Sequence, residues 1–149
     1  MTYNFENPAI EWTVYKDNNF SVVIRNWKTK TRYPDSDIQY KQNPDSDGCY
    51  VVNRWNVYAH IFDTHRLFDK PETVMNAPFH GGCNYEQKIT FTPALGLRYD
   101  WQKEHTTYKF GCDYAHLYDS RFEEYDGKDG VPYEIQNDAK ELVEWLKEG

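Results

Sequence analysis

Residues 50–62, Tyr-Val-Val-Asn-Arg-Trp-Asn-Val-Tyr-Ala-His-Ile-Phe, form the longest β-prone run of the chain. Aromatic and β-branched side chains dominate this run, and such side chains pack well on a pleated, half-buried surface. We therefore expect a long strand here, with the remaining elements of the fold arranged around it.

Shorter runs on both sides predict further strands. Residues 19–27 alternate, with Phe20, Val22 and Ile24 directed to one face. Proline and glycine residues predict a polar loop over residues 33–48. The other predicted strands are residues 10–15, 85–91, 96–101 and 106–112.

The C-terminal residues show helical periodicity instead. Residues 134–147 are predicted to form an amphipathic helix, because apolar side chains recur there at helical spacing. A helical turn is expected at residues 71–75, with Pro71 in its first position, and an acidic loop over residues 119–130. The predicted class is α+β, a single domain over residues 1–149 in which a mainly antiparallel sheet of five to six strands is packed by the C-terminal helix. The apolar helix positions are Ile135, Ala139, Leu142, Val143 and Leu146.

The composition limits the classes of partner. The net charge is −7 and the mean hydropathy is −0.94, yet 17% of the residues are aromatic, which argues against disorder. The negative charge disfavours DNA and RNA polymers as partners. The basic residues 25–32 predict either phosphate contacts or a solvated strand edge. We expect no membrane contact and no secretion signal, and the three irregularly spaced cysteines predict no disulfide framework and a cytosolic location.

Two glycine-containing segments are the candidates for a functional site. They are His80-Gly81-Gly82 and Gly111-Cys112-Asp113-Tyr114-Ala115-His116, and both lie where predicted strands begin or end. Loops at strand ends often carry function, and glycines allow positive φ angles and the close approach of a ligand. Asp113 and Asp119 each lie three residues from His116. In a helical turn they would flank its imidazole and raise the pKa of His116.

The residues alone leave four interpretations of these segments open. The first is a zinc site made by His80, Cys83, Cys112 and His116. The second is catalysis by Cys112 or Asp113 together with a histidine. The third is polar recognition of a ligand, and the fourth is a structural turn that holds two strands together. The chain has no P-loop, GxGxxG, GxSxG or HExxH motif, so the large catalytic families that depend on those motifs are disfavoured.

The order of motifs resembles a widespread family of small bacteriophage proteins. Members show a Gly-Tyr-Val strand, a His-Pro turn, a His-Gly-Gly-Leu-Thr-Tyr segment, a Gly-Phe-Asp-x-Ala-His-x-x-Asp segment and a C-terminal helix. The resemblance covers residues 58–119 and the last fifteen residues. It departs from the family at Arg66, Cys83 and Cys112, where members have Pro, Leu and Phe, so neither cysteine occupies a position that the motif requires. The matching segments here are Val57-Tyr58-Ala59, His65-Arg66, His80-Gly81-Gly82-Cys83-Asn84-Tyr85 and Gly111-Cys112-Asp113-Tyr114-Ala115-His116-Leu117-Tyr118-Asp119.

This family looks like the anti-CBASS sponges, phage proteins that bind the cyclic dinucleotide signal of a bacterial defence system without cutting it. The resemblance implies a non-catalytic protein of the host cytoplasm that sequesters a ligand such as 3′3′-cyclic GMP-AMP. It implies no cofactor and no metal. It also implies a homo-oligomer such as a tetramer, with ligand sites near the subunit boundaries.

In such a protein we expect the purines to stack on aromatic side chains and the phosphates to contact cations. Two alternatives stay open. One is a hydrolase acting on a nucleotide or nucleotide-derived signal, with His80 and His116 as the acid–base pair and Asp113 as the orienting residue. The other is a protein-interaction module that binds a host protein through its acidic C-terminal part. The expected ligand-binding residues are His80, Gly81, Gly82, Tyr85, Arg98, Trp101, Lys109, Asp113, Tyr114, His116, Arg25 and Lys28.

Overall fold

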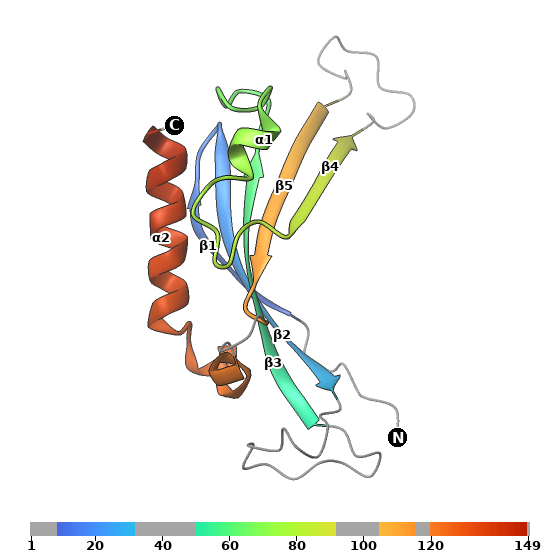
Figure 1. Cartoon of the computed structure of the whole chain (residues 1–149), viewed down its shortest axis with the longest axis vertical. Coiled ribbons are helices and arrows are strands. Elements are labelled where there is room, and N and C mark those ends of the chain that lie inside the picture. The colour runs from blue at the N-terminus through green and yellow to red at the C-terminus, as the bar shows by residue number, and fades with distance from the viewer. Residues whose placement is uncertain (1–8, 32–49, 92–104, 116–119, 149) are drawn as a thin grey trace.

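The computed structural model describes residues 9–31, 50–91, 105–115 and 120–148, and within them the chain forms one antiparallel sheet covered by a helix (Figure 1). The sheet has five strands in the order β1-β2-β3-β5-β4, and every neighbouring pair is antiparallel. The predicted α+β class is confirmed. The strands are β1 (Ile10–Lys16), β2 (Phe20–Thr31), β3 (Tyr50–Ile61), β4 (Tyr85–Phe91) and β5 (His105–Asp113).

Helix α2 (Tyr133–Glu148) lies along one face of this sheet, and its bounds agree with the predicted helix to within one residue at each end (Figure 1). The short helix α1 (Pro71–Val74) has proline at its start, as expected. The predicted acidic loop contains two 3₁₀ helices, η2 (Ser120–Glu124) and η3 (Gly127–Asp129). The predicted strand at 96–101 and loop at 33–48 lie outside the described residues. No described helix is long and apolar enough to cross a membrane.

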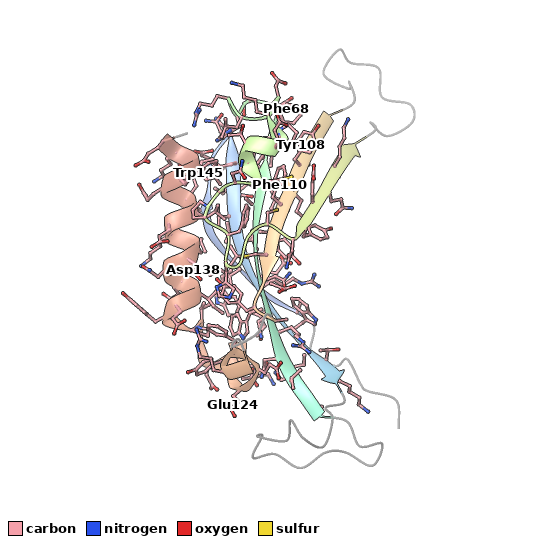
Figure 2. The ribbon with its side chains drawn as sticks, in the orientation of Figure 1. Phe68, Tyr108, Phe110, Glu124, Asp138 and Trp145 are labelled. Atoms are coloured by element: carbon pink, nitrogen blue, oxygen red, sulfur yellow. The ribbon has the colours of Figure 1, made fainter. Side chains whose placement is uncertain are left out.

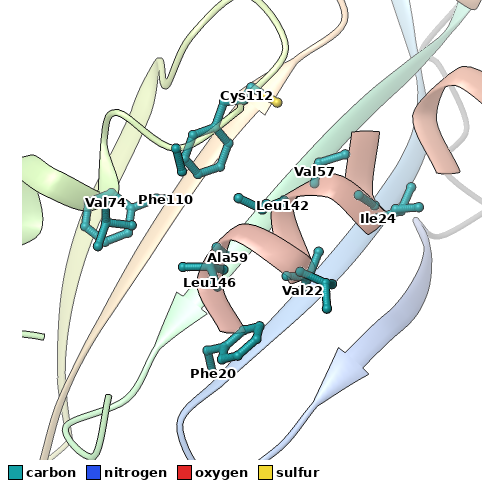
Figure 3. Close-up of a cluster of buried hydrophobic side chains, with 14 of the residues drawn as sticks. Phe20, Val22, Ile24, Val57, Ala59, Val74, Phe110, Cys112, Leu142 and Leu146 are labelled. Carbon is teal, nitrogen blue, oxygen red and sulfur yellow. The ribbon is translucent and has the colours of Figure 1, made fainter. Parts of the chain in front are cut away.

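The core fills the space between α2 and the sheet (Figure 3). Alternation in β2 directs Phe20, Val22 and Ile24 toward the helix, and each is at most 2% exposed. Leu142 and Leu146 of α2 meet them from the other side. Burying a side chain of this size contributes roughly 1.5–3 kcal/mol, so this layer is the main source of stability. The other core residues from the sheet include Val57, Ala59, Ile61, Phe110 and Cys112, with half-buried Trp145 of α2 packed against them (Figure 2).

The side chains between these core residues project to the opposite face of the sheet. Cross-strand pairing groups them into three rows, and we call the face that they define the polar face. One row contains Arg25, Asn56 and Asp113; the next contains Val23, Tyr58, Gly111 and Tyr85; the third contains Ser21, His60, Lys109 and Gln87.

The segment between β5 and α2 is anchored to the sheet by Asn26. Its Oδ1 accepts the N–H of Gly127 at 3.0 Å, and its Nδ2 donates to the carbonyl of Arg54. A Cβ at Gly127 would lie 2.9 Å from the ring of Trp12, so glycine allows this close approach. The anchor fixes the position from which α2 begins its path along the sheet.

Candidate functional site

The His80 turn and the end of β5 meet on the helix side of the sheet. The imidazole of His80 stacks on the ring of Tyr114, with centroids 4.2 Å apart and planes 13° from parallel. The Tyr114 hydroxyl donates to Asp138 Oδ2 of α2 at 2.6 Å, and His80 Nδ1 lies 3.9 Å from the same oxygen (Figure 2). These contacts tie the turn, β5 and α2 together. His116 lies outside the described residues.

Tyr114 belongs to the core. It is 2% exposed, and the edge of its ring system meets buried Phe122 at a centroid distance of 5.0 Å. The imidazole of His80 stacks on the face of the Tyr114 ring, and the Tyr114 hydroxyl donates to Asp138. We therefore correct the prediction that Tyr114 stacks on a ligand, because packing already occupies the ring.

The backbone conformation of the turn explains why both of its central residues are glycines. Gly81 and Gly82 have φ angles of 67° and 92°, in the region that favours glycine. The N–H of Gly82 donates to the carbonyl of Phe79 at 2.9 Å and closes the turn. This N–H is therefore used within the turn, although both glycines are exposed.

The thiol of Cys112 is buried in the core and keeps its proton at neutral pH. Burial raises the pKa of its thiol to about 12, even though the backbone N–H groups of His80 and Val57 favour the thiolate. Among the described residues, no three His, Cys, Asp or Glu side chains are close enough together to hold a metal ion. Cys83 donates its S–H to the carbonyl of Tyr85. Among the described residues, therefore, nothing supports a zinc site or catalysis by a thiol.

A second group of predicted residues gathers around Tyr58 on the polar face. The ammonium of Lys109 lies 4.1 Å from the centroid of the Tyr58 ring. Asn56 Nδ2 donates to the Tyr58 hydroxyl oxygen at 2.9 Å, and the nearby charge of Arg25 acts to lower the pKa of that phenol. Burial raises the pKa of Tyr58, so the phenol keeps its proton at neutral pH. Because its oxygen accepts from Asn56, its O–H can donate to a further acceptor.

The charges around this phenol are mainly positive. The pKa of Lys109 is lowered, first by burial and then by the like charge of Arg25, while Glu11 raises it. Glu11 Oε1 lies 3.8 Å from Arg25 Nε, beyond hydrogen-bond distance. Asp113, at the end of the Arg25 row, accepts the N–H of Ala115 at 3.2 Å. A bound anion would reduce the repulsion between the two cations.

Tyr85 supplies an aromatic surface beside these donors. It is 37% exposed, and its ring lies edge-on to that of Tyr58 with centroids 5.6 Å apart. Lys109 Nζ is 5.7 Å from the Tyr85 centroid. Gly111 separates the two tyrosines within one row of the sheet. A cation and a stacking surface therefore lie within reach of one small ligand.

The sequence analysis missed Asn56, Tyr58 and His60 as site residues. His60 is half-buried beside Lys109, and its pKa is lowered first by burial and then by that lysine. A signal was present in the sequence, because these three residues alternate with the apolar side chains of Trp55, Val57, Ala59 and Ile61. Alternation places them together on the face that the helix does not cover.

The structure thus divides the predicted residues between the two faces of the sheet. Arg25, Tyr85, Lys109 and Asp113 lie on the polar face, whereas His80 and Tyr114 lie on the helix side. Lys28 is separate from both groups, since its ammonium pairs with Asp126 Oδ2 at 2.9 Å. Arg98, Trp101 and His116 lie outside the described residues.

Comparisons of the chain with protein-family models, with curated proteins and with solved structures find no match. The fold and the site together define an α+β protein whose antiparallel sheet carries a core on one face and a group of cations and tyrosines on the other.

Proposed function

We propose that the protein binds a small nucleotide anion on its polar face and sequesters it without cleaving it. The proposed ligand is a cyclic dinucleotide such as 3′3′-cyclic GMP-AMP. The observation that supports this proposal is that two cations gather at one phenol. The Lys109 ammonium lies 4.1 Å from the centroid of the Tyr58 ring, and the charge of Arg25 acts to lower the pKa of the same residue. A phosphate offers only acceptors, so it is the complementary group.

The energies of such contacts are sufficient for useful affinity. A charge-assisted hydrogen bond contributes about 1.5–3 kcal/mol, and a base stacked on an aromatic ring about 1–3 kcal/mol. One polar face offers one such group of donors and the exposed ring of Tyr85. A cyclic dinucleotide has two phosphates and two bases, so a homo-oligomer that brings two polar faces to one ligand doubles these contacts.

The described geometry favours sequestration over the hydrolase alternative. His80, the proposed acid–base residue, packs on Tyr114 beside Asp138 of α2 and so lies on the other side of the sheet from the two cations. The resemblance to phage anti-CBASS proteins supplies the biological setting, which is the cytoplasm of an infected bacterium.

Recovery of the ligand tests sequestration directly. The protein is incubated with 3′3′-cyclic GMP-AMP, freed of unbound ligand, and denatured by heat. We expect chromatography of the supernatant to return the intact cyclic dinucleotide in a fixed ratio to protein. Linear dinucleotide or mononucleotides in the supernatant would establish cleavage instead, and absence of any retained ligand would reject binding.

Matched variants assign the binding to the polar face. Arg25→Ala and Lys109→Ala should each weaken binding roughly tenfold or more in calorimetric titrations, because each removes a charged donor. Lys88→Ala is the control, since Lys88 is an exposed cation on β4 whose register partner Tyr108 belongs to the helix side. Equal effects of Lys88→Ala and Lys109→Ala would mean that only overall charge attracts the ligand.

A further inference from the structure

Two buried polar atoms of the polar face have no hydrogen-bond partner among the described residues. They are Arg25 Nε and Asn56 Oδ1, and a third such atom, Asn53 Oδ1, belongs to the same strand as Asn56 but not to the three rows of this face. Asn56 is only 8% exposed, and its other amide atom already donates to Tyr58. Buried polar groups in native proteins are nearly always paired, so an unpaired donor and an unpaired acceptor at one site suggest a missing ligand.

The two atoms are complementary to a hydroxyl group. Arg25 and Asn56 are direct partners in the β2–β3 ladder, so their side chains project from adjacent positions on the same face of the sheet. One offers a donor and the other an acceptor. A hydroxyl can satisfy both, whereas a phosphate or carboxylate only accepts and an ammonium only donates.

This hydroxyl would lie next to the bound anion. Asn56 Nδ2 is 2.9 Å from the Tyr58 hydroxyl, and Oδ1 is separated from Nδ2 only by the amide carbon. The group that satisfies Oδ1 is therefore a close neighbour of the phosphate that Tyr58 holds. In a ribonucleotide the 2′-hydroxyl is on the carbon beside the 3′-phosphate, while the donors of the base lie across the sugar.

We propose that Arg25 and Asn56 bind the ribose 2′-hydroxyl of the nucleotide, so that the polar face selects ribonucleotides over 2′-deoxyribonucleotides. The 2′-hydroxyl is the group by which proteins distinguish these two classes of ligand. This inference rests on the proposed function, because it assigns the sugar at the same site whose phosphate contacts were described above.

Calorimetric titration of the full chain with two ligands tests the inference. The ligands are 3′3′-cyclic GMP-AMP and its counterpart that lacks both 2′-hydroxyls. The wild type should prefer the ribose ligand roughly tenfold, the effect of losing about two hydrogen bonds. Asn56→Ala should reduce this preference toward one. Asn53→Ala should preserve it. The Oδ1 of Asn53 also lacks a partner among the described residues, but Asn53 pairs with Lys28 in the ladder and not with Arg25. Its amide donates to the Glu123 carbonyl.

The outcomes separate this inference from the proposed function. Equal wild-type affinity for the two ligands would overturn the selection of ribose and leave anion binding intact. Failure of both ligands to bind would overturn both proposals. If Asn56→Ala does not fold, the side-chain amide signal of Asn56 in the labelled wild type replaces it. That signal should shift further with the ribose ligand than with the deoxy ligand, which reaches Asn56 only through Tyr58, and equal shifts would reject the inference.

Discussion

The ring of Tyr58 lies directly against the backbone of Gly111, so that a Cβ atom at residue 111 would be 2.5 Å from Tyr58 Cδ1 and 2.8 Å from Cε1. Any larger residue there would push the ring away from the sheet, together with the hydroxyl to which Asn56 donates. The glycine of the motif therefore has a positioning role. It allows a tyrosine of the neighbouring strand to lie in place beneath Lys109.

Gly111→Ala should consequently reduce the free energy of unfolding by roughly 1–3 kcal/mol, the usual cost of overpacking. Urea denaturation measures this change. In a Tyr58→Ala background the same substitution should cost clearly less, since the ring that it strikes is gone. Additive effects of the two substitutions would show that the close approach of Tyr58 is not what requires glycine.

The carboxylate of Glu11 lies 3.8 Å from Arg25 Nε, so it would compete with an anion bound at Arg25. Glu11→Gln should therefore tighten binding of 3′3′-cyclic GMP-AMP about two- to fivefold at low salt, in keeping with the strength of exposed ion pairs. Glu86→Gln is the control, because Glu86 pairs with the core residue Phe110 and belongs to the helix side. Weaker binding by Glu11→Gln would show that the ion pair organises Arg25 for the ligand.

Asp126 makes stability depend on pH in the acid range. Its pKa is lowered below 3.8, first by the backbone N–H of Lys128 and then by Lys28. The unfolded chain therefore binds a proton at higher pH than the folded chain does. The stabilisation is complete well above pH 3.8 and is lost as the pH falls through the folded pKa.

Asp126→Asn should thus cost up to about 1 kcal/mol at pH 6, as expected for a partly exposed ion pair. At pH 2–3 it should cost almost nothing. Urea denaturation at both pH values gives the two differences. Asp129→Asn, which changes an exposed carboxylate on η3, is the control. A cost that is equal at both pH values would mean that the charge of Asp126 contributes nothing.

His65 joins the segment after β3 to the last turn of α2. The N–H of Leu67 donates to His65 Nδ1 at 3.0 Å, so the ring proton is on Nε2, which lies 3.1 Å from the carbonyl of Leu146. That carbonyl is in the last turn of α2, where the helix itself supplies no partner. His65→Leu should destabilise the protein by about 1–3 kcal/mol.

Hydrogen exchange measures the effect of this substitution at the end of α2 itself. The amides in the last turn of α2 should lose protection in His65→Leu and regain part of it in His65→Gln, whose amide can donate to Leu146. Unchanged protection in His65→Leu would show that apolar packing alone holds the end of α2.

The fold was largely predictable because its signals are local. Alternation in β2 and the helical spacing from Ile135 to Leu146 each specify one buried face, and a sheet with one such helix follows from them. The spacing of residues along the sequence does not show which strands pair with one another. Arg25 and Lys109 are far apart in the chain, and they share a face only because β3 pairs with both β2 and β5.

The candidate site was predictable only in part for the same reason. His80 and Asp113 were expected at one site because both belong to glycine-containing segments at the ends of predicted strands. Alternation along β5 directs Asp113 to the polar face, while the residues on either side of it, Cys112 and Tyr114, enter the core and meet His80. A shift of one position along a strand moves a side chain to the other face, which motif spacing cannot reveal.

The proposed function requires that the nucleotide binds on the polar face. Titration of ¹⁵N-labelled protein with unlabelled 3′3′-cyclic GMP-AMP, followed through the backbone amide signals, tests this most directly. The account predicts that the largest shifts fall within residues 23–25, 56–60, 85–87 and 109–111. Shifts concentrated in residues 79–82 and 133–148, with those four segments unchanged, would place the ligand on the helix side and contradict it.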